Sequence, residues 1–366
     1  MWHLLSRIRY GDHVLSVVVA LLMTVSIVVL YATSLAGDSF ALMYRQIAAF
    51  AIGVVLYIAF SLYDYHRLSS ANRVAYVVFF ILLLAVLIFA REIRGSSRWI
   101  DLGFFQLQPA ELFKIVVLLG VSRWLYVHRG QINSWVNIAI TLLYAGLPAS
   151  LIMLQPDLGS SIVVMSIWFG LLLISPIRKR FVLGLLLLAV VAAAFGWQFV
   201  FSDFQKDRIH TFLDPSSETR GRGYNVRQAI IAVGNGGVSG QGLGKGLQGQ
   251  LKFLPERQTD FVFASLSEDF GFVGATSLLL LYYIVLSRLI RAMREAKDGL
   301  GRYIVGGVFW MFLVQVTINV GMNIGLLPVT GIPLPFLTYG GSSAITVLAA
   351  LGIAQNVIIQ SKALRF

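Results

Sequence analysis

The sequence predicts an all-α integral membrane protein with about ten transmembrane helices. Hydrophobic residues make up 57% of the 366 positions and charged residues only 13%, about half the share found in soluble domains. Ten apolar runs are each long enough, at about 18 residues or more, to span a hydrocarbon core. These runs are 13–35, 44–63, 73–90, 109–127, 135–155, 157–175, 180–200, 262–287, 302–326 and 341–361. We therefore expect residues 1–366 to form a single polytopic membrane domain.

The positions of the basic residues predict how the helices are oriented. If the N-terminus lies inside, more than half of the 29 Lys and Arg residues fall at cytoplasmic ends of the helices. The short outer loops then hold only Arg45, Arg91, Arg94 and Arg98. The positive-inside rule therefore places both termini in the cytoplasm. The net charge of +12 follows mostly from this topology, so it does not indicate nucleic-acid binding.

One long polar segment, residues 202–261, separates the seventh and eighth predicted spans and becomes a large extracytoplasmic loop. Loops of this length are usually functional or disordered, and its mixture of glycines, charges and apolar residues favours function. The run Gly234–Gly246 reads GNGGVSGQGLGKG. Such glycines let backbone N–H groups approach a phosphate, but the spacing is not that of a nucleotide-binding loop. A flexible surface loop is an equal alternative.

Charged residues within the spans gather in the outward-facing half of the membrane. Glu111 and Lys114 lie three residues apart near the outer end of the fourth span, so they share a helix face and can pair. Asp157 opens the sixth span at the same level. Because intramembrane charges are costly and often functional, this asymmetry predicts a cavity open to the outer leaflet. The alternative is a structural ion pair with hydrogen bonds between helices.

Other polar or irregular stretches can be explained by structural roles as well as by functional ones. Hydrogen bonding between helices is the favoured interpretation of the polar residues in the eighth and ninth spans. These residues are Glu268, Asp269, Gln315, Asn319 and Asn323. The segment 325–343 is apolar but too rich in Pro and Gly for a regular helix. It forms either a wall of the outer cavity or a tight connection between the last two spans.

Asp260 is the sharpest candidate for a catalytic group. It ends the sequence LKFLPERQTD and enters the eighth span next to apolar residues. Partial desolvation would raise the pKa of a carboxyl at this position towards the range that is useful for a general base. A helix cap provided by Thr259 or Asp260 is an equally good interpretation of the residues alone.

The sequence offers little for a metal or redox centre. It contains no cysteine, which removes disulfides and thiolate sites. Its five histidines are scattered, so no metal-binding cluster is expected. A divalent cation, Mg²⁺ or Mn²⁺, would have to be held between carboxylates and a bound diphosphate, and no residue pattern specifies such a site.

Six motifs together resemble the SEDS family (shape, elongation, division and sporulation). They are GSSRWIDLG (95–103), QPAELFKI (108–115), QPDLGSS (155–161), the glycine-rich run, LKFLPERQTDFVFA (251–264) and NIGLLPVTGIPLPFLTYGGSS (323–343). They span most of the chain in the family's order and are most similar to the branch that acts in cell elongation. The departures are mild, since Ala110 stands where a small hydroxyl residue is common and Asn235 where Ser is common.

The resemblance implies a ten-helix peptidoglycan glycosyltransferase of the bacterial cytoplasmic (inner) membrane. Such proteins polymerise lipid II and work with a class B penicillin-binding protein in the elongation machinery. Asp260 matches the family's essential loop aspartate and is expected to be the general base, with undecaprenyl diphosphate leaving. The family's cavity residues correspond to Glu111, Lys114 and Asp157, and important outer-face positions correspond to Arg45 and Trp99. We add Arg98, Lys245 and Glu256, from the same motifs, as substrate-binding candidates.

Two other functions fit the same topology. A lipid II flippase would need polar residues along its whole path, whereas the inner halves of the spans hold almost no charges. A scaffold that only recruits a penicillin-binding protein would leave the charges of Glu111, Lys114 and Asp157 unexplained.

Overall fold

The computed structural model describes residues 10–35, 39–89, 98–101, 106–199, 201, 203–213, 222–246, 253–254 and 256–363. Within these residues the chain is almost entirely helical. One short antiparallel pair joins β1 (Ile100–Asp101) to β2 (Gln106–Leu107). The predicted all-α class is confirmed.

Each of the ten predicted apolar runs corresponds to one long helix. In chain order these are α2 (His13–Leu35), α3 (Ala41–Leu62), α4 (Tyr65–Phe89), α5 (Pro109–Val127), α6 (Trp135–Leu154), α7 (Leu158–Ile174), α8 (Lys179–Phe199), α12 (Val262–Glu295), α13 (Gly299–Asn323) and α14 (Gly341–Ala363). In the described part of the chain, eight helices are long and apolar enough to cross a membrane. The other two of the ten are α7, which is apolar but only 17 residues long, and α5, which carries Glu111, Lys114 and Arg123.

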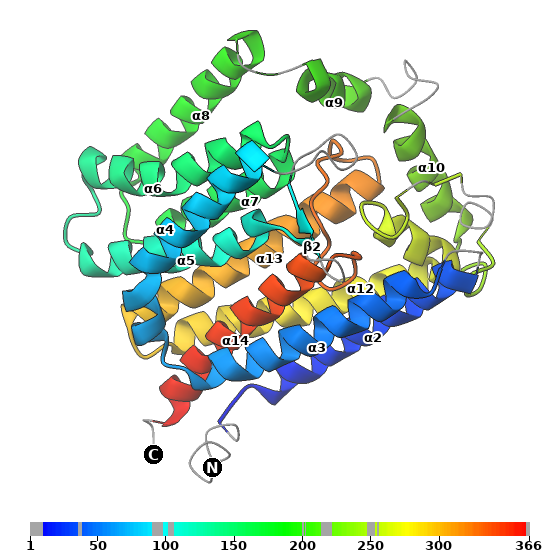
Figure 1. The fold of residues 1–366 in the computed structure, drawn as a ribbon, viewed down its shortest axis with the longest axis horizontal. Coiled ribbons are helices and arrows are strands. Elements are labelled where there is room, and N and C mark those ends of the chain that lie inside the picture. The colour runs from blue at the N-terminus through cyan, green and yellow to red at the C-terminus, as the bar shows by residue number, and fades with distance from the viewer. Residues whose placement is uncertain are drawn as a thin grey trace.

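The core of the bundle lies around α13 and α14. The membrane-length part of α14 is completely buried, and Figure 1 shows this helix running alongside α3, with which it packs. α13 packs against both α7 and α12. By contrast, α8 lies at the edge of the molecule in Figure 1 and has only Phe181, Leu185 and Gly196 buried. An apolar helix exposed in this way is suited to face lipid.

The long loop between α8 and α12 is partly helical and is folded onto the bundle. It contains α9 (Asp203–Leu213) and α10 (Arg222–Asn235), and α10 packs against α12 and α13. The glycine-rich run that follows lies against the first turns of α12, where Phe272 N donates to Gly237 O at 2.8 Å. Gly271, at φ +67°, interrupts the regular helix at this contact. A Cβ at Gly271 would collide with the backbone of the glycine-rich run.

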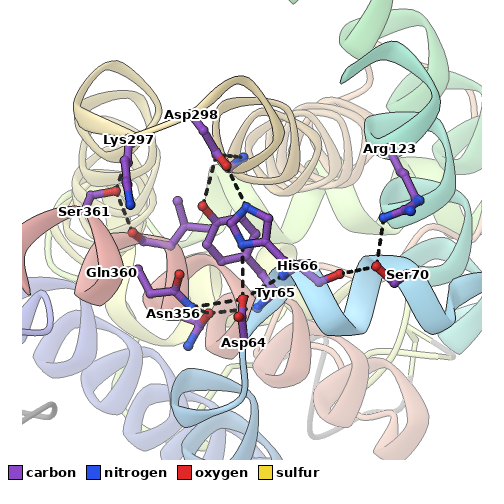
Figure 2. A network of polar contacts seen from close by, with 12 residues as sticks. Asp64, Tyr65, His66, Ser70, Arg123, Lys297, Asp298, Asn356, Gln360 and Ser361 are labelled. Atoms are coloured by element: carbon purple, nitrogen blue, oxygen red, sulfur yellow. Dashed lines mark hydrogen bonds and ion pairs between the residues drawn. The ribbon is translucent and has the colours of Figure 1, made fainter. Parts of the chain in front are cut away.

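A polar network joins several helices at the opposite end of the bundle, as Figure 2 shows. Asp298 caps α13 by accepting from Gly301 N at 2.7 Å. It also accepts from Tyr65 Oη at 3.0 Å and contacts His66 Nε2 at 2.8 Å. Asn356 of α14 accepts from Tyr65 N at 3.1 Å. The network therefore fixes the start of α4 to α13 and α14, at the end that the positive-inside rule assigns to the cytoplasm.

Asp298→Ala is expected to lower the free energy of unfolding by about 1–2 kcal/mol. The change removes a helix cap, which alone costs about 1 kcal/mol, and it leaves the Tyr65 hydroxyl without its acceptor. Denaturant titration of the purified protein in detergent measures the effect. Ser134 is the matched control because it precedes α6 without a side-chain cap hydrogen bond, so Ser134→Ala should cost less than about 0.5 kcal/mol. Equal losses in the two variants would contradict the role given to Asp298.

Candidate active site

Asp260 lies in a turn whose backbone is held by α13. Asn323 Nδ2 donates to Asp260 O at 3.0 Å, and Asn319 Nδ2 lies 3.4 Å from the same carbonyl oxygen. Asn323 Oδ1 also accepts from Ala264 N, at 3.0 Å, in the first turn of α12. Both asparagines are fully buried. They are interhelical hydrogen-bond partners, as the sequence favours, and their effect is to fix the position of Asp260.

The irregular segment between α13 and α14 forms one side of this turn. Thr338 Oγ1 donates to Thr259 O at 3.1 Å, and Tyr339 N donates to Gln258 O at 2.8 Å. Gly331, at φ +74°, lies beside the carboxylate, since a Cβ built on it would be 3.8 Å from Asp260 Oδ2. The segment packs against protein, which is where irregular backbone is tolerated at membrane depth. It is therefore both a wall beside Asp260 and the connection between two helices.

Burial and neighbouring charges perturb the Asp260 carboxyl. Burial is the largest cause that raises its pKa, from 3.8 to about 6, and the Glu256 carboxylate adds to the rise. The cations of Arg208 and Arg98 oppose the rise, and the carboxylate of Asp157 adds a smaller contribution to it. A group with this pKa is ionised at neutral pH and is still basic enough to accept a proton. The four charged neighbours define the electrostatic surroundings of the site.

Asp157 and Arg98 are held together on the α5–α7 side of the site. Asp157 caps α7, with Oδ1 accepting from Ser160 N at 3.0 Å. Its Oδ2 accepts from Gln108 Nε2 at 2.7 Å, at the start of α5. Arg98 Nη1 lies 3.7 Å from Asp157 Oδ1, and Arg98 Nε donates to Gln155 O at 3.1 Å. The QPAELFKI, QPDLGSS and GSSRWIDLG motifs therefore meet at one point.

Arg208, on α9, is a member of the site that the sequence did not single out. Its Nη1 donates to Thr330 O at 3.1 Å, next to Gly331 and the Asp260 carboxylate. It lines a cavity of about 40 Å³ together with Phe212, Ile230 and others. No motif marks Arg208, because it lies in the first half of the long loop. The only feature of the sequence that pointed towards Arg208 was the positive charge of that loop.

Glu111 and Lys114 form a buried ion pair. Lys114 Nζ lies 2.5 Å from Glu111 Oε1, and the side chains are 0% and 3% exposed. The second carboxylate oxygen, Glu111 Oε2, has no hydrogen-bond partner among the described residues. The pairing expected from the i, i+3 spacing is present. Neither residue is among the charges that perturb Asp260.

Of the other residues expected from the sequence, some lie beside Asp260 or Arg98 and some do not. Glu256, at φ +56°, belongs to the same turn, and its Oε2 accepts from Thr259 Oγ1 at 2.7 Å. Trp99 lies beside Arg98, whose guanidinium carbon is 5.9 Å from the ring centroid. Arg45 and Lys245 are both exposed. Neither of these two is among the charged groups that act on Asp260.

The glycine-rich run surrounds a carboxylate of the protein itself. The backbone N–H groups of Gly244 and Gly246 donate to the carboxylate of Asp269, and Arg257 adds a favourable charge. Arg257 in turn donates from Nη2 to Thr33 O at 2.9 Å, which ties the loop to the end of α2. Backbone N–H groups arranged in this way can bind anions. Here they bind Asp269, so the arrangement supports a structural role for the run over a phosphate site.

The described residues contain no group of three or more His, Asp or Glu side chains that could hold a metal ion. Asp157 and Asp260 are carboxylates that share one site, and one or two carboxylates hold Mg²⁺ only together with substrate phosphates.

Residues 11–363 match the family described as the cell cycle proteins FtsW, RodA and SpoVE. The chain belongs to this family. One relative, MrdB of Escherichia coli K12, named a peptidoglycan glycosyltransferase, is 35% identical over 359 residues, covering 98% of this chain and 96% of MrdB. Stage V sporulation protein E of Bacillus subtilis is 36% identical over 357 residues, covering 94% of this chain and 96% of the relative.

Two solved structures have the same fold. One belongs to a study of how a peptidoglycan synthase complex coordinates polymerization and crosslinking, and its matching chain is 30% identical, with a TM-score of 0.80 and coverage of 96% and 98%. The other is the rod shape determining protein RodA of Thermus thermophilus, 29% identical, with a TM-score of 0.70 and coverage of 95% and 96%. The SEDS resemblance is confirmed. The chain is a multi-pass protein of the bacterial cytoplasmic membrane.

Proposed function

We propose that this chain is a peptidoglycan glycosyltransferase that polymerises lipid II into glycan strands during cell elongation, with Asp260 as the general base. The observation that carries the proposal is the environment of the Asp260 carboxyl. Its pKa is about 6, cations of Arg98 and Arg208 act on it, and buried asparagines fix its backbone. The similarity of this chain to MrdB, which is named a peptidoglycan glycosyltransferase, supports this reaction class.

The proposed reaction joins two lipid-linked sugars. A sugar hydroxyl attacks the anomeric carbon of the second substrate while Asp260 accepts the hydroxyl proton. The new C–O bond forms as the bond from the anomeric carbon to the diphosphate breaks, with inversion of configuration. Undecaprenyl diphosphate leaves with the electron pair, and Arg98 and Arg208 stabilise its charge. Because this leaving group is already acidic, one carboxylate base is sufficient, unlike the two carboxylates of glycosidases.

Substrate positioning must provide much of the rate, since a general base contributes only about 10²–10⁴-fold. We assign Asp157 and Glu256 to substrate binding beside the base, and Arg45 and Lys245 to contacts farther from it. The cavity of about 40 Å³ beside Arg208 is far smaller than the pockets that hold small ligands.

We further propose a class B penicillin-binding protein as the partner. A chain of similar fold occurs in a peptidoglycan synthase complex that couples polymerization to crosslinking, which supports this pairing.

Reconstitution in lipid vesicles distinguishes the proposed function from its two alternatives. The purified protein and its partner are supplied with labelled lipid II, and both strand formation and lipid movement across the bilayer are recorded. The polymerase predicts glycan strands whose formation requires this chain. Lipid II movement without strands would support the flippase instead. Strands that the partner makes equally well without this chain would support the scaffold.

The strand-forming rate is expected to fall as the pH drops through about 6. The base must be ionised, and burial with the Glu256 carboxylate raises the pKa of Asp260 to about 6. Below that pH the rate should fall about tenfold per pH unit, and above about pH 7 it should be constant. A rate profile of the purified complex measures this, with lipid II held at a constant fraction of KM. A rate that is constant down to pH 4.5 would contradict the role of Asp260 as base.

The same pKa predicts how Asp260 affects stability. A carboxyl whose pKa is higher in the folded than in the unfolded protein destabilises the fold once it is ionised, and the effect disappears when both states are protonated. Asp260→Asn should therefore stabilise the protein most above about pH 6. The gain should shrink as the pH falls towards 3.8. Thermal unfolding of both proteins at several pH values provides the comparison.

A further inference from the structure

A cavity at the cytoplasmic end of the bundle is separate from the site described above. Its volume is about 300 Å³, and residues from α4, α5 and α6 line it. Arg123, on its edge, donates from Nη1 to Ser70 Oγ at 2.9 Å, a bond that Figure 2 shows beside the Asp298 network. The positive-inside rule places this end at the cytoplasmic leaflet, across the membrane from the predicted position of Asp260.

Buried polar atoms in the cavity wall have no hydrogen-bond partner. Ser69 Oγ, Asn72 Oδ1 and Trp124 Nε1 are buried, and none is paired within the described part of the chain. Ser69 is 1% exposed and Asn72 is 4% exposed. Buried polar atoms are costly to leave unpaired. The wall therefore offers both donors and acceptors to a polar ligand.

The charged residues that line the cavity are all basic. Arg73 is exposed and has no ion-pair partner among the described residues, and Arg123 lies across the cavity on α5. The ring of His128 stacks on that of Trp124 with 4.1 Å between centroids. No carboxylate is among the lining residues. Two guanidinium groups next to neutral hydrogen-bonding atoms suit a phosphate group.

Apart from Thr141 and Tyr144, the remaining lining is largely apolar and reaches the outer surface of the helix bundle. Val121 is buried, whereas Val127 and Ile140 are 60% and 38% exposed. Inorganic phosphate would gain nothing from these side chains, but the upper part of an acyl chain would be buried by them. The volume is near the lower limit for small-molecule sites. It is too small for the disaccharide-peptide headgroup of a lipid-linked cell-wall precursor.

We propose that this cavity binds an anionic glycerophospholipid of the cytoplasmic leaflet. Arg73 and Arg123 bind the phosphodiester, and the hydroxyls of the headgroup pair with Ser69 Oγ and Asn72 Oδ1. Val127 and Ile140 contact the first methylene groups of an acyl chain. The hydrogen-bonding atoms favour a headgroup with free hydroxyls, so phosphatidylglycerol is the probe. The site is independent of the polymerase reaction.

Native mass spectrometry of the delipidated full chain in detergent tests the proposal by titration with phosphatidylglycerol. The variant R73Q/R123Q is expected to bind about 25-fold more weakly than wild type, from about fivefold for each cation removed. The matched control R67Q/R178Q removes two exposed arginines from the same end that do not line the cavity. Its affinity should stay within about twofold of wild type. Equal weakening in both double variants would overturn the proposal, because it would indicate general surface attraction.

A second variant tests the cavity itself with the arginines intact. Ile140→Trp fills the apolar side of the cavity from a partly exposed position and should weaken binding of phosphatidylglycerol about tenfold. Wild-type affinity in this variant would place the lipid on the surface and overturn the proposal. Phosphatidylcholine should bind at least about tenfold more weakly than phosphatidylglycerol. Equal binding of phosphatidylcholine, or displacement of the lipid by millimolar inorganic phosphate or glycerol phosphate, would also overturn it.

Discussion

Asp260→Ala is expected to lower the rate of glycan strand synthesis by at least about 10²–10⁴-fold, the contribution of a positioned general base. The attacking hydroxyl then keeps its proton until it is lost to solvent, so the C–O bond forms without assistance. The backbone of the turn should be retained, because Asn319 and Asn323 bind the carbonyl oxygen of residue 260 and not its side chain. Strand length and yield from labelled lipid II, with the partner present, measure the loss.

Asp207 provides the matched control for that loss. It is an exposed carboxylate in the same loop between α8 and α12, one residue before Arg208, and it is not among the groups that act on Asp260. Asp207→Ala should therefore retain the wild-type rate to within about twofold. Full activity in Asp260→Ala, or an equal loss in both variants, would contradict the assignment of the base.

Lys114→Ala is expected to lower the free energy of unfolding by about 3–5 kcal/mol, the cost of breaking a buried ion pair. Lys114 is completely buried and is 2.5 Å from Glu111 Oε1. Removing it leaves a carboxylate in the bundle whose other oxygen already lacks a partner in the described residues. Denaturant titration in detergent, or the yield of monodisperse protein, measures the loss.

A double substitution separates charge from volume in this pair. Glu111→Gln with Lys114→Met removes both charges at similar volume, and it should recover most of the stability because isosteric replacement of buried ion pairs is often neutral. Arg67→Ala removes an exposed cation in the first turn of α4 and should cost less than about 1 kcal/mol. If the double variant were as unstable as Lys114→Ala, the buried carboxylate would not be the cause.

The membrane helices were predictable because hydropathy is a strong signal over 18 or more residues. Their ends were less predictable where polar residues continue a helix past the apolar run. α12 extends to Glu295, eight residues beyond the predicted end at 287, and Arg291 pairs with Glu295 at 2.9 Å in its last turns. Similarly, α4 begins at Tyr65 and not at residue 73. α9 and α10 were not predicted, since short polar helices have no hydropathy signal.

The site was partly predictable from the sequence. Asp260, Glu256, Asp157 and Arg98 were all expected, and the structure brings the last three within electrostatic reach of Asp260. Their proximity depends on contacts between motifs that lie far apart in the sequence, and no local sequence pattern specifies such contacts. Arg208 was missed for the same reason, as its relation to Asp260 depends on how α9 packs.

The composition of the glycine-rich run did not predict which anion its backbone N–H groups bind. Its glycines suggested a phosphate cradle, but the N–H groups of Gly244 and Gly246 are directed at Asp269. The sequence could not reveal this, because the carboxylate lies more than 20 positions further along the chain, on α12.

The kinetics of Asp260→Asn test the central claim most directly. The amide keeps the shape of the side chain but cannot accept the proton, so only the chemical step should be affected. We predict that lipid II binds to this variant with an affinity within about threefold of wild type, whereas kcat for strand formation falls at least about 100-fold. An unchanged kcat, or a loss explained entirely by weaker lipid II binding, would contradict Asp260 as the general base.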